Sequence, residues 1–258
     1  MEGHNDQAKL PTVVIEKYLP AAVEALSRAF KDQMVADAFL AAFTAKQITF
    51  TVEPDSFVED KTAPAFWNGS NGLRLIDGKL DIFIKKSSFW VNTNSLEQVK
   101  IDTVLANLPK AAGALPLDVQ VKLRDTKVVR DAEVARAAKA LGIDALTYDA
   151  EADYSQILAA APAKADVGAY TQYFKALATL FERQAKDEMV KEAIVDALSA
   201  KKVSVRVVAD MKAVTGLKMD NGYNGVQIDG GVITVITTAG DYWTNVSKLE
   251  QLDLIKLF

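Results

Sequence analysis

The sequence of residues 31–50 returns, with changes, in residues 186–205, and this internal similarity constrains the fold more than any other feature. The two segments read KDQMVADAFLAAFTAKQITF and KDEMVKEAIVDALSAKKVSV, and eight of the twenty aligned positions are identical. Most of the other positions keep their apolar or polar character. Self-similarity at a long, nearly fixed offset is the signature of a repeated structural unit. The sequence therefore predicts an internal duplication.

The similarity continues beyond these segments in the same order along the chain. The further matched pairs are NGSNG at 68–72 with NGYNG at 221–225, Asp77-Gly78 with Asp229-Gly230, Trp90 with Trp243, and LEQ at 96–98 with LEQ at 249–251. A chain of 258 residues is long enough for two domains of ordinary size. We expect a first α+β repeat over residues 12–105, a connecting α/β segment over 106–165 and a second α+β repeat over 166–258.

Each repeat has the pattern of a helix, four strands and a helix. Apolar residues recur at helical spacing from about 20 to 46, and residues 48–52 alternate apolar with polar as a half-buried strand does. Asp77-Gly78 separates two alternating runs over 73–84, which is typical of a hairpin with a type I′ turn. A short fourth strand at 89–92, matched at 242–245, and helices at 95–105 and 247–258 complete the two units. The predicted fold class is α+β, with two copies of a helix–four-stranded antiparallel sheet–helix unit.

The connecting segment has no counterpart elsewhere in the chain. Its patterns predict a strand at 117–123, a helix at 131–141 that ends at Gly142, a short strand at 145–148 and a helical turn or two at 155–161. Such a segment packs against both repeats or forms a small α/β element of its own.

Composition removes much of the usual catalytic chemistry. The chain has no Cys, and its single His is His4, in a polar N-terminal stretch. Thiol nucleophiles, zinc fingers and disulfides are therefore excluded, and Ser-His-Asp triads and His-based metal sites are not expected. No phosphate-binding or dinucleotide-binding glycine motif is present. We expect no enzyme activity, no cofactor and no metal.

The chain carries no targeting signal that we can recognise. Residues 1–11 lack the basic stretch and apolar core of a signal peptide, although a signal removed in processing would leave no trace. No run of about 18 apolar residues is present to span a membrane. The sequence is that expected of a cytoplasmic protein without a membrane partner.

The paired NGxNG segments allow two interpretations. Clustered glycines let backbone groups face a bound ion, and residues 220–225 partly match a calcium loop. The match fails because Gly231 stands where the loop needs a bidentate Glu. The simpler interpretation is that Asn and Gly supply left-handed turns before a strand.

The candidate binding residues combine basic and aromatic side chains. Lys79, Lys85 and Lys86 precede Phe89 and Trp90 in the first repeat, and Trp243 is the counterpart of Trp90. Aromatic residues interleaved with basic ones on a sheet stack on the bases of single strands and contact the phosphates. Aromatic residues matched between two repeats are also typical core anchors, and the second repeat has no counterpart of the lysine pair.

Two functions follow from these features. The first is a non-catalytic binding or adaptor protein that acts through a protein partner or through self-association. The alternative is a protein that binds single-stranded RNA or DNA on the sheet surface. The net charge of −4 opposes the alternative, because phosphate neutralisation supplies most of such affinity, although a local basic patch can act within an acidic chain. An enzyme or small-ligand carrier is a third class, without a reacting group to support it.

Overall fold

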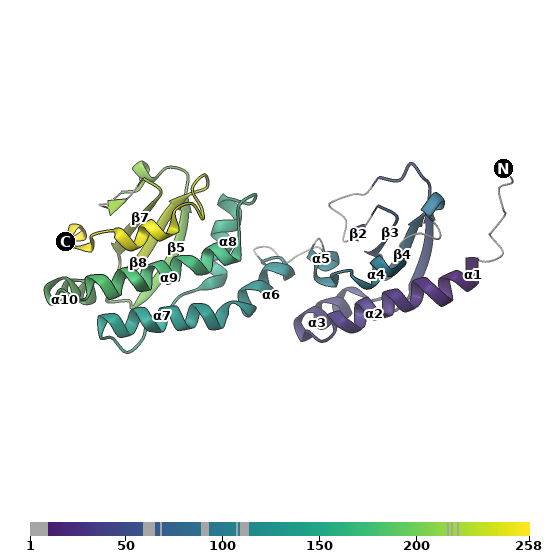
Figure 1. Cartoon of the computed structure of the whole chain (residues 1–258), viewed down its shortest axis with the longest axis horizontal. Helices are drawn as coiled ribbons and strands as arrows, with labels where there is room; N and C mark the ends of the chain where they lie inside the picture. The colour runs from purple at the N-terminus through teal and green to yellow at the C-terminus, as the bar shows by residue number, and fades with distance from the viewer. Residues whose placement is uncertain are drawn as a thin grey trace. The chain divides into compact units, whose positions relative to one another are not determined.

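The computed structural model describes residues 10–58, 65–67, 69–88, 93–106, 108, 114–215, 217, 219–220 and 222–258. The chain divides into two compact units, Met1–Val121 and Lys122–Phe258. Each is an α+β arrangement of helices and one sheet (Figure 1). No helix among the described residues is long and apolar enough to cross a membrane.

The first unit begins with helical segments rather than the single helix predicted for 20–46. They are α1 Leu10–Val13, the π-helical turn η2 Val14–Tyr18, α2 Leu19–Ala29 and α3 Gln33–Ala42. Pro20 lies in the first turn of α2, where its missing N–H is harmless. The helix breaks before Asp32, which adopts an extended conformation and caps α3 by accepting a 3.0 Å hydrogen bond from the Met34 N–H.

The sheet of the first unit is mixed, so the predicted antiparallel sheet is wrong. Its strands are β1 Ile48–Glu53, β2 Ala65–Trp67, β3 Asn71–Ile76 and β4 Lys79–Lys85, in the order β1-β4-β3-β2. β1 pairs parallel with β4, and the β3–β4 and β2–β3 pairs are antiparallel. The chain leaves β1 for the far edge of the sheet, so the second strand of the hairpin returns beside β1 in the same direction. The short β2 is the fourth strand, and the strand predicted at 89–92 lies outside the described residues.

The predicted hairpins are confirmed. In the first, Ile76 pairs with Lys79, and both turn residues have positive φ, 50° at Asp77 and 72° at Gly78. This is the geometry that a type I′ turn requires. In the second unit Asp229 pairs with Val232, so the turn is Gly230-Gly231, one residue later than the sequence alignment placed it.

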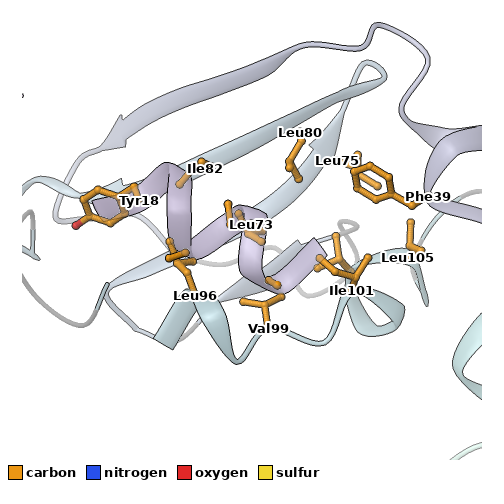
Figure 2. Packing of buried hydrophobic residues seen from close by; sticks show 14 of the residues in the cluster. Tyr18, Phe39, Leu73, Leu75, Leu80, Ile82, Leu96, Val99, Ile101 and Leu105 are labelled. Carbon is orange, nitrogen blue, oxygen red and sulfur yellow. The ribbon is translucent and has the colours of Figure 1, made fainter. Parts of the chain in front are cut away.

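The core of the first unit lies between the sheet and helices α2, α4 (Thr93–Glu97) and α5 (Ile101–Ala106). Alternate residues of β3 and β4 point to this side, because successive side chains of a strand face opposite ways. Figure 2 labels the buried side chains Tyr18, Phe39, Leu73, Leu75, Leu80, Ile82, Leu96, Val99, Ile101 and Leu105. The helix predicted at 95–105 is thus two short helices, separated at 98–100.

Helix α6, Leu117–Asp125, replaces the predicted strand at 117–123. The sequence alternates in polarity there, but Leu115, Val119 and Leu123 are the buried residues, and a spacing of four belongs to a helix face. α7, Lys127–Leu141, ends at Gly142, which has a φ of 72°. The predicted end of that helix is confirmed, because a left-handed Gly is a common helix C-terminus.

The second unit contains α7, α8 Ala150–Ala160, α9 Val167–Gln184, α10 Glu188–Ala197 and a second mixed sheet. Its strands are β5 Lys202–Val208, β6 Met219–Asp220, β7 Asn224–Asp229 and β8 Val232–Thr238, in the order β5-β8-β7-β6, with β5 parallel to β8. The strand predicted at 145–148 is a single bridge from Thr147 to Lys202. The helix predicted at 155–161 is the longer α8.

The C-terminal part of this unit differs from its prediction. Residues 241–245 form turns, where a fourth strand was expected. The predicted helix at 247–258 is two 3₁₀ segments, η5 Val246–Gln251 and η6 Leu254–Leu257. α9 holds this tail, because Arg183 Nε donates to the Glu250 carbonyl at 3.0 Å and Gln184 Nε2 donates to the Leu252 carbonyl at 3.2 Å.

Candidate binding site around Trp243

The structure does not gather the predicted lysines into one patch. Lys79 and Lys85 are the first and last residues of β4, roughly 20 Å apart at the usual rise of a strand. Lys86 follows β4 and is exposed. Phe89 and Trp90 lie outside the described residues, so nothing places them beside these lysines.

An acidic residue accompanies the two neighbouring lysines. The Asp55 carboxylate accepts a 2.8 Å hydrogen bond from the Ser87 N–H. Hydrogen bonds from Ser87, and then the charges of Lys85 and Lys86, lower the pKa of Asp55. The positive potential around this lysine pair is therefore partly offset.

Trp243 is on the surface of the second unit. Its side chain is 58 % exposed, so the interpretation of this residue as a core anchor is wrong. Its neighbour Tyr242 is fully buried and donates a 3.0 Å hydrogen bond from its hydroxyl to the Asp166 carbonyl at the start of α9. The buried tyrosine thus fixes the turn, and the next side chain is presented to solvent.

The backbone of Trp243 is in an uncommon conformation. Its φ is 71°, and that of Asn245 is 51°. Positive φ is rare for a bulky residue, because it brings the side chain too close to the following carbonyl oxygen. The cost is about 1–2 kcal/mol. Such a conformation persists only where the surrounding structure imposes it, and these positions cluster at functional sites.

A buried polar network imposes this conformation. Asn224 Nδ2 donates to the carbonyls of Thr244 and Asn245 at 3.2 and 3.3 Å. The Tyr173 hydroxyl donates to Asn224 Oδ1 at 3.2 Å and accepts the Trp243 N–H at the same distance. The side-chain amide of Asn224 and the hydroxyl of Tyr173 thus satisfy three backbone groups of the turn. Removing one partner of a buried hydrogen bond is costly, because the other partner is left without one away from water.

The tyrosines of the network stay protonated. Burial is the main cause that raises the pKa of Tyr173 and also that of Tyr242. The rings lie 5.8 Å apart, centroid to centroid. Each hydroxyl therefore remains a hydrogen-bond donor throughout the physiological pH range.

The simpler interpretation of the paired NGxNG segments, as turns, holds for only part of each segment. Gly69 and Gly222 have φ of 91° and 84° and do form turns. Asn71 and Asn224, by contrast, are the first residues of β3 and β7 and are fully buried. The sequence signal for Asn224 was its recurrence in both repeats, but nothing in the sequence indicated that it would hold the Trp243 turn.

Trp243 borders an open pocket of about 580 Å³ between α9 and η5. The lining residues are Asp166, Ala169, Gln172, Lys175, Ala176, Trp243, Asn245, Val246, Ser247 and Glu250. Asp166 caps α9 by accepting a 2.8 Å hydrogen bond from the Ala169 N–H. On α9, Lys175 and Ala176 follow Gln172 by three and four residues, and Ala169 precedes it by three, so these lining residues share one helix face.

The chemistry of this pocket suits a mixed apolar and polar ligand. The lining combines the indole and small apolar side chains with the charged residues Lys175, Asp166 and Glu250. Two carboxylates against one ammonium disfavour a phosphate chain. No group of three or more His, Cys, Asp or Glu that could hold a metal occurs in the part of the chain that the structure describes. No family model, curated protein or solved structure matches this chain.

Proposed function

We propose that this chain is a non-catalytic binding protein that acts through protein–protein contacts, and that Trp243 anchors a partner segment. One observation carries the proposal: an exposed indole, held on a strained backbone by a buried network, borders an open pocket. Tryptophan is among the residues that contribute most to binding at protein interfaces. The turn keeps the indole in solvent although positive φ is unfavourable for tryptophan. Binding of a partner at the indole would explain why this conformation is kept.

The pocket indicates the chemistry of the partner. Trp243, Ala169 and Ala176 offer apolar contacts to one apolar residue, and the lysine and carboxylates of the lining suit hydrogen bonds to a peptide backbone or to side chains of either charge. The partner segment is therefore an extended peptide or loop with one apolar anchor and polar neighbours.

We also propose that the two units descend from one duplicated unit. The identical strand orders support this interpretation, as do two matched residue pairs. Asp32 and Asp187 both cap a helix, α3 and α10, with the carboxylate on a Met N–H at 3.0 Å. Asn71 and Asn224 both begin a strand and are buried.

The test uses Trp243→Gly in the full chain. Glycine tolerates positive φ, so this variant keeps the turn and removes the indole. Peptides selected from a displayed random library on the wild-type protein should lose at least about tenfold in affinity for the variant, measured by fluorescence polarisation. Phe258→Ala is the matched control, because Phe258 is a comparably exposed aromatic residue outside the pocket lining. Peptides that bind Trp243→Gly as tightly as wild type would refute the proposal.

Nucleic-acid binding is the second candidate, supported by the exposed Lys86 beside Lys85. Titrating single-stranded DNA and RNA oligonucleotides at increasing salt separates the two functions. Binding that weakens steeply with salt and falls in Lys85→Gln/Lys86→Gln would favour this candidate. We expect no such binding, because the negative charge of Asp55 partly offsets the charges of the same lysines.

A further inference from the structure

Strand β1 lies at the edge of the first sheet. Within the described residues it pairs with β4 and with no other strand. The Leu80 N–H donates to the Gln47 carbonyl at 3.0 Å, so odd-numbered residues of β1 face β4, because bonding alternates along a strand. The N–H and C=O groups of Ile48, Phe50 and Val52 therefore point to the open edge.

The equivalent edge of the second unit is covered by the chain itself. The Val203 N–H donates to the Thr147 carbonyl at 2.8 Å. The Val205 N–H donates to the Asp153 carboxylate at 3.0 Å, and the Val207 N–H donates to Gln156 Oε1 at 3.0 Å. All three valines are buried. A bridge residue and helix α8 thus supply acceptors for every outward N–H of β5 from 203 to 207.

The open edge of β1 is apolar, and nothing in the described part of the first unit protects it against pairing. Ile48 is 46 % exposed and Val52 is 42 % exposed. Natural edge strands are usually guarded by Lys, Pro, a bulge or a covering segment. The β1 sequence, ITFTVE, has no Lys or Pro, and its pairing with β4 runs without a bulge from Ile48 to Glu53.

The sequence of β1 is nearly symmetric about Phe50. Reading outward from Phe50 gives Thr on both sides, and then a β-branched apolar residue on both sides. We propose that β1 pairs antiparallel with β1 of a second copy of this chain, about a two-fold axis that passes beside Phe50. A two-fold interface brings one surface against itself, so it requires this kind of self-complementarity.

The register follows from the geometry of the edge. An axis perpendicular to the sheet keeps both apolar faces on one side and places Phe50 opposite Phe50, Ile48 opposite Val52, and Thr49 opposite Thr51. The outward groups of 48, 50 and 52 then bond to one another across the axis, as hydrogen-bonded antiparallel pairs do. Aromatic, β-branched and Thr pairs are all favourable opposite one another in a sheet. The first-unit sheet of one copy and the first-unit sheet of the other copy then form one continuous sheet.

Cysteine pairing tests this register directly, because the native chain has no cysteine. In the proposed dimer the Cα atoms of residue 48 and residue 52 of the other copy are about 5.5 Å apart, within disulfide range. Residue 48 and its own symmetry mate are about 14 Å apart, beyond it. A mixture of Ile48→Cys and Val52→Cys chains should therefore form the mixed disulfide several-fold faster than either variant alone forms a symmetric disulfide. A mixture of Ile76→Cys chains with either variant should show no such acceleration.

Sedimentation equilibrium of the full chain tests the association itself. The wild type should dimerise, and Val52→Lys should weaken the dimer at least about tenfold, because a charge on an edge strand opposes pairing. Ile76→Lys is the matched control: Ile76 is 49 % exposed in the same sheet but lies on β3, away from the edge. Circular dichroism of both variants checks that they fold.

A wild type that stays monomeric at millimolar concentration overturns the proposal, and so does a dimer that Val52→Lys leaves intact. A mixed disulfide no faster than the two symmetric ones overturns the register. The result is independent of the Trp243 proposal, because Trp243→Gly should dimerise like wild type and Val52→Lys should bind the selected peptides like wild type.

Discussion

Each of the two sheets buries a carboxylate beside its first strand, but the two carboxylates come from different elements. In the first unit Asp81 lies on β4 and is 2 % exposed. Its Oδ1 accepts hydrogen bonds from the hydroxyls of Thr49 and Thr51 at 2.7 and 2.8 Å. Its Oδ2 accepts one from Arg74 Nε at 2.8 Å. The carboxylate therefore joins three strands within the sheet.

In the second unit the carboxylate belongs to Asp153 on α8. It accepts hydrogen bonds from the Ser204 hydroxyl at 2.6 Å, and from the Val205 N–H and the Tyr170 hydroxyl, both at 3.0 Å. The strand register places Thr234 opposite Ser204, where the first unit places Asp81 opposite Thr49.

The difference shows how the same strand order yields an open or a closed edge. A carboxylate inside the sheet binds the hydroxyls of β1 and does not reach the outward N–H groups of that strand, for which the described residues show no acceptor. A carboxylate delivered by a helix binds both a hydroxyl and an outward N–H, and so brings α8 over the edge of β5. The two units thus differ in the element that carries this acidic residue, and they differ in the same way in whether a helix covers the edge of the first strand.

Asp81→Ala should give the largest loss of stability. It leaves two hydroxyls and one guanidinium N–H without their acceptor, and unsatisfied buried groups cost about 1–3 kcal/mol each. Arg74 keeps its 2.7 Å contact with Glu53, so we expect a total of about 3–4 kcal/mol. Hydrogen exchange of the β1 and β4 amides measures the loss in the first unit alone.

Thr234→Ala is the matched control for Asp81→Ala, because Thr234 occupies the equivalent register position in the second sheet. It should cost no more than about 1 kcal/mol. Equal losses for the two substitutions would show that the sheet does not depend on the Asp81 carboxylate in the way its contacts indicate.

Gly231→Ala should destabilise the second hairpin by about 2–3 kcal/mol. The φ of Gly231 is 77°, and an added Cβ would lie 2.5 Å from the Ala200 backbone nitrogen, which belongs to the turn before β5. Backbone atoms cannot yield as a flexible side chain does. Urea unfolding followed by circular dichroism measures the change, and a loss below about 0.5 kcal/mol would contradict it.

Asp153→Asn tests whether the carboxylate of the closed edge is held at an energetic disadvantage. Burial is the main cause that raises the pKa of Asp153. The folded protein then binds this proton more tightly than the unfolded chain, whose Asp titrates near about 3.9. The contribution of Asp153 to stability is therefore fully present below that pH and is lost as pH rises through the folded pKa.

The measurement for Asp153→Asn is the unfolding free energy of wild type minus that of the variant, from pH 7 to about pH 4. Asparagine does not titrate, so the pH dependence of this difference comes from Asp153 alone. The difference should therefore increase as pH falls. Asp131→Asn is the control, because hydrogen bonds from Lys127 and Tyr148 lower the pKa of Asp131, and its difference should decrease. A difference for Asp153 that decreases as pH falls would contradict the sign.

Local patterns predicted the hairpins and the end of one helix, because Asp77-Gly78 and Gly142 specify backbone conformations by themselves. They did not predict that β1 runs parallel to β4, since strand direction depends on where the following loop carries the chain. Residues 117–123 fit both the period of a strand and that of a helix, and burial of Val119 and Leu123 decided for the helix.

The sequence predicted one residue of the candidate site, Trp243, but not the geometry of the site. The internal sequence similarity identified Trp243, but matching it to Trp90 carried no information about its φ or its exposure. Those depend on Asn224 and Tyr173, which lie far from it in the sequence. Lys79 and Lys85 are close in the sequence yet occupy the two ends of one strand, because extended chain separates residues that a helix would gather.

The smallest expected effect comes from the two hairpin turns. Asp77 and Gly230 hold the same turn position, with φ of 50° and 55°, and a Cβ added to Gly230 would meet nothing within 4 Å. Gly230→Asp should therefore fit, and it restricts the unfolded chain, which stabilises by about 0.4–1 kcal/mol. Asp adds little positive-φ strain compared with a bulky residue, because its short polar side chain hydrogen-bonds to the local backbone. We expect a net gain of about 0.5 kcal/mol, and a similar loss for Asp77→Gly.

Differential scanning calorimetry of both variants checks this reciprocity, with thermal midpoints expected to move about 1–2 °C in opposite directions. The alternative is that the Asp77 side chain is tolerated at a cost and that glycine is better in both turns. In that case both midpoints would favour glycine, and the turn residues of the two units would differ for a reason other than chain entropy.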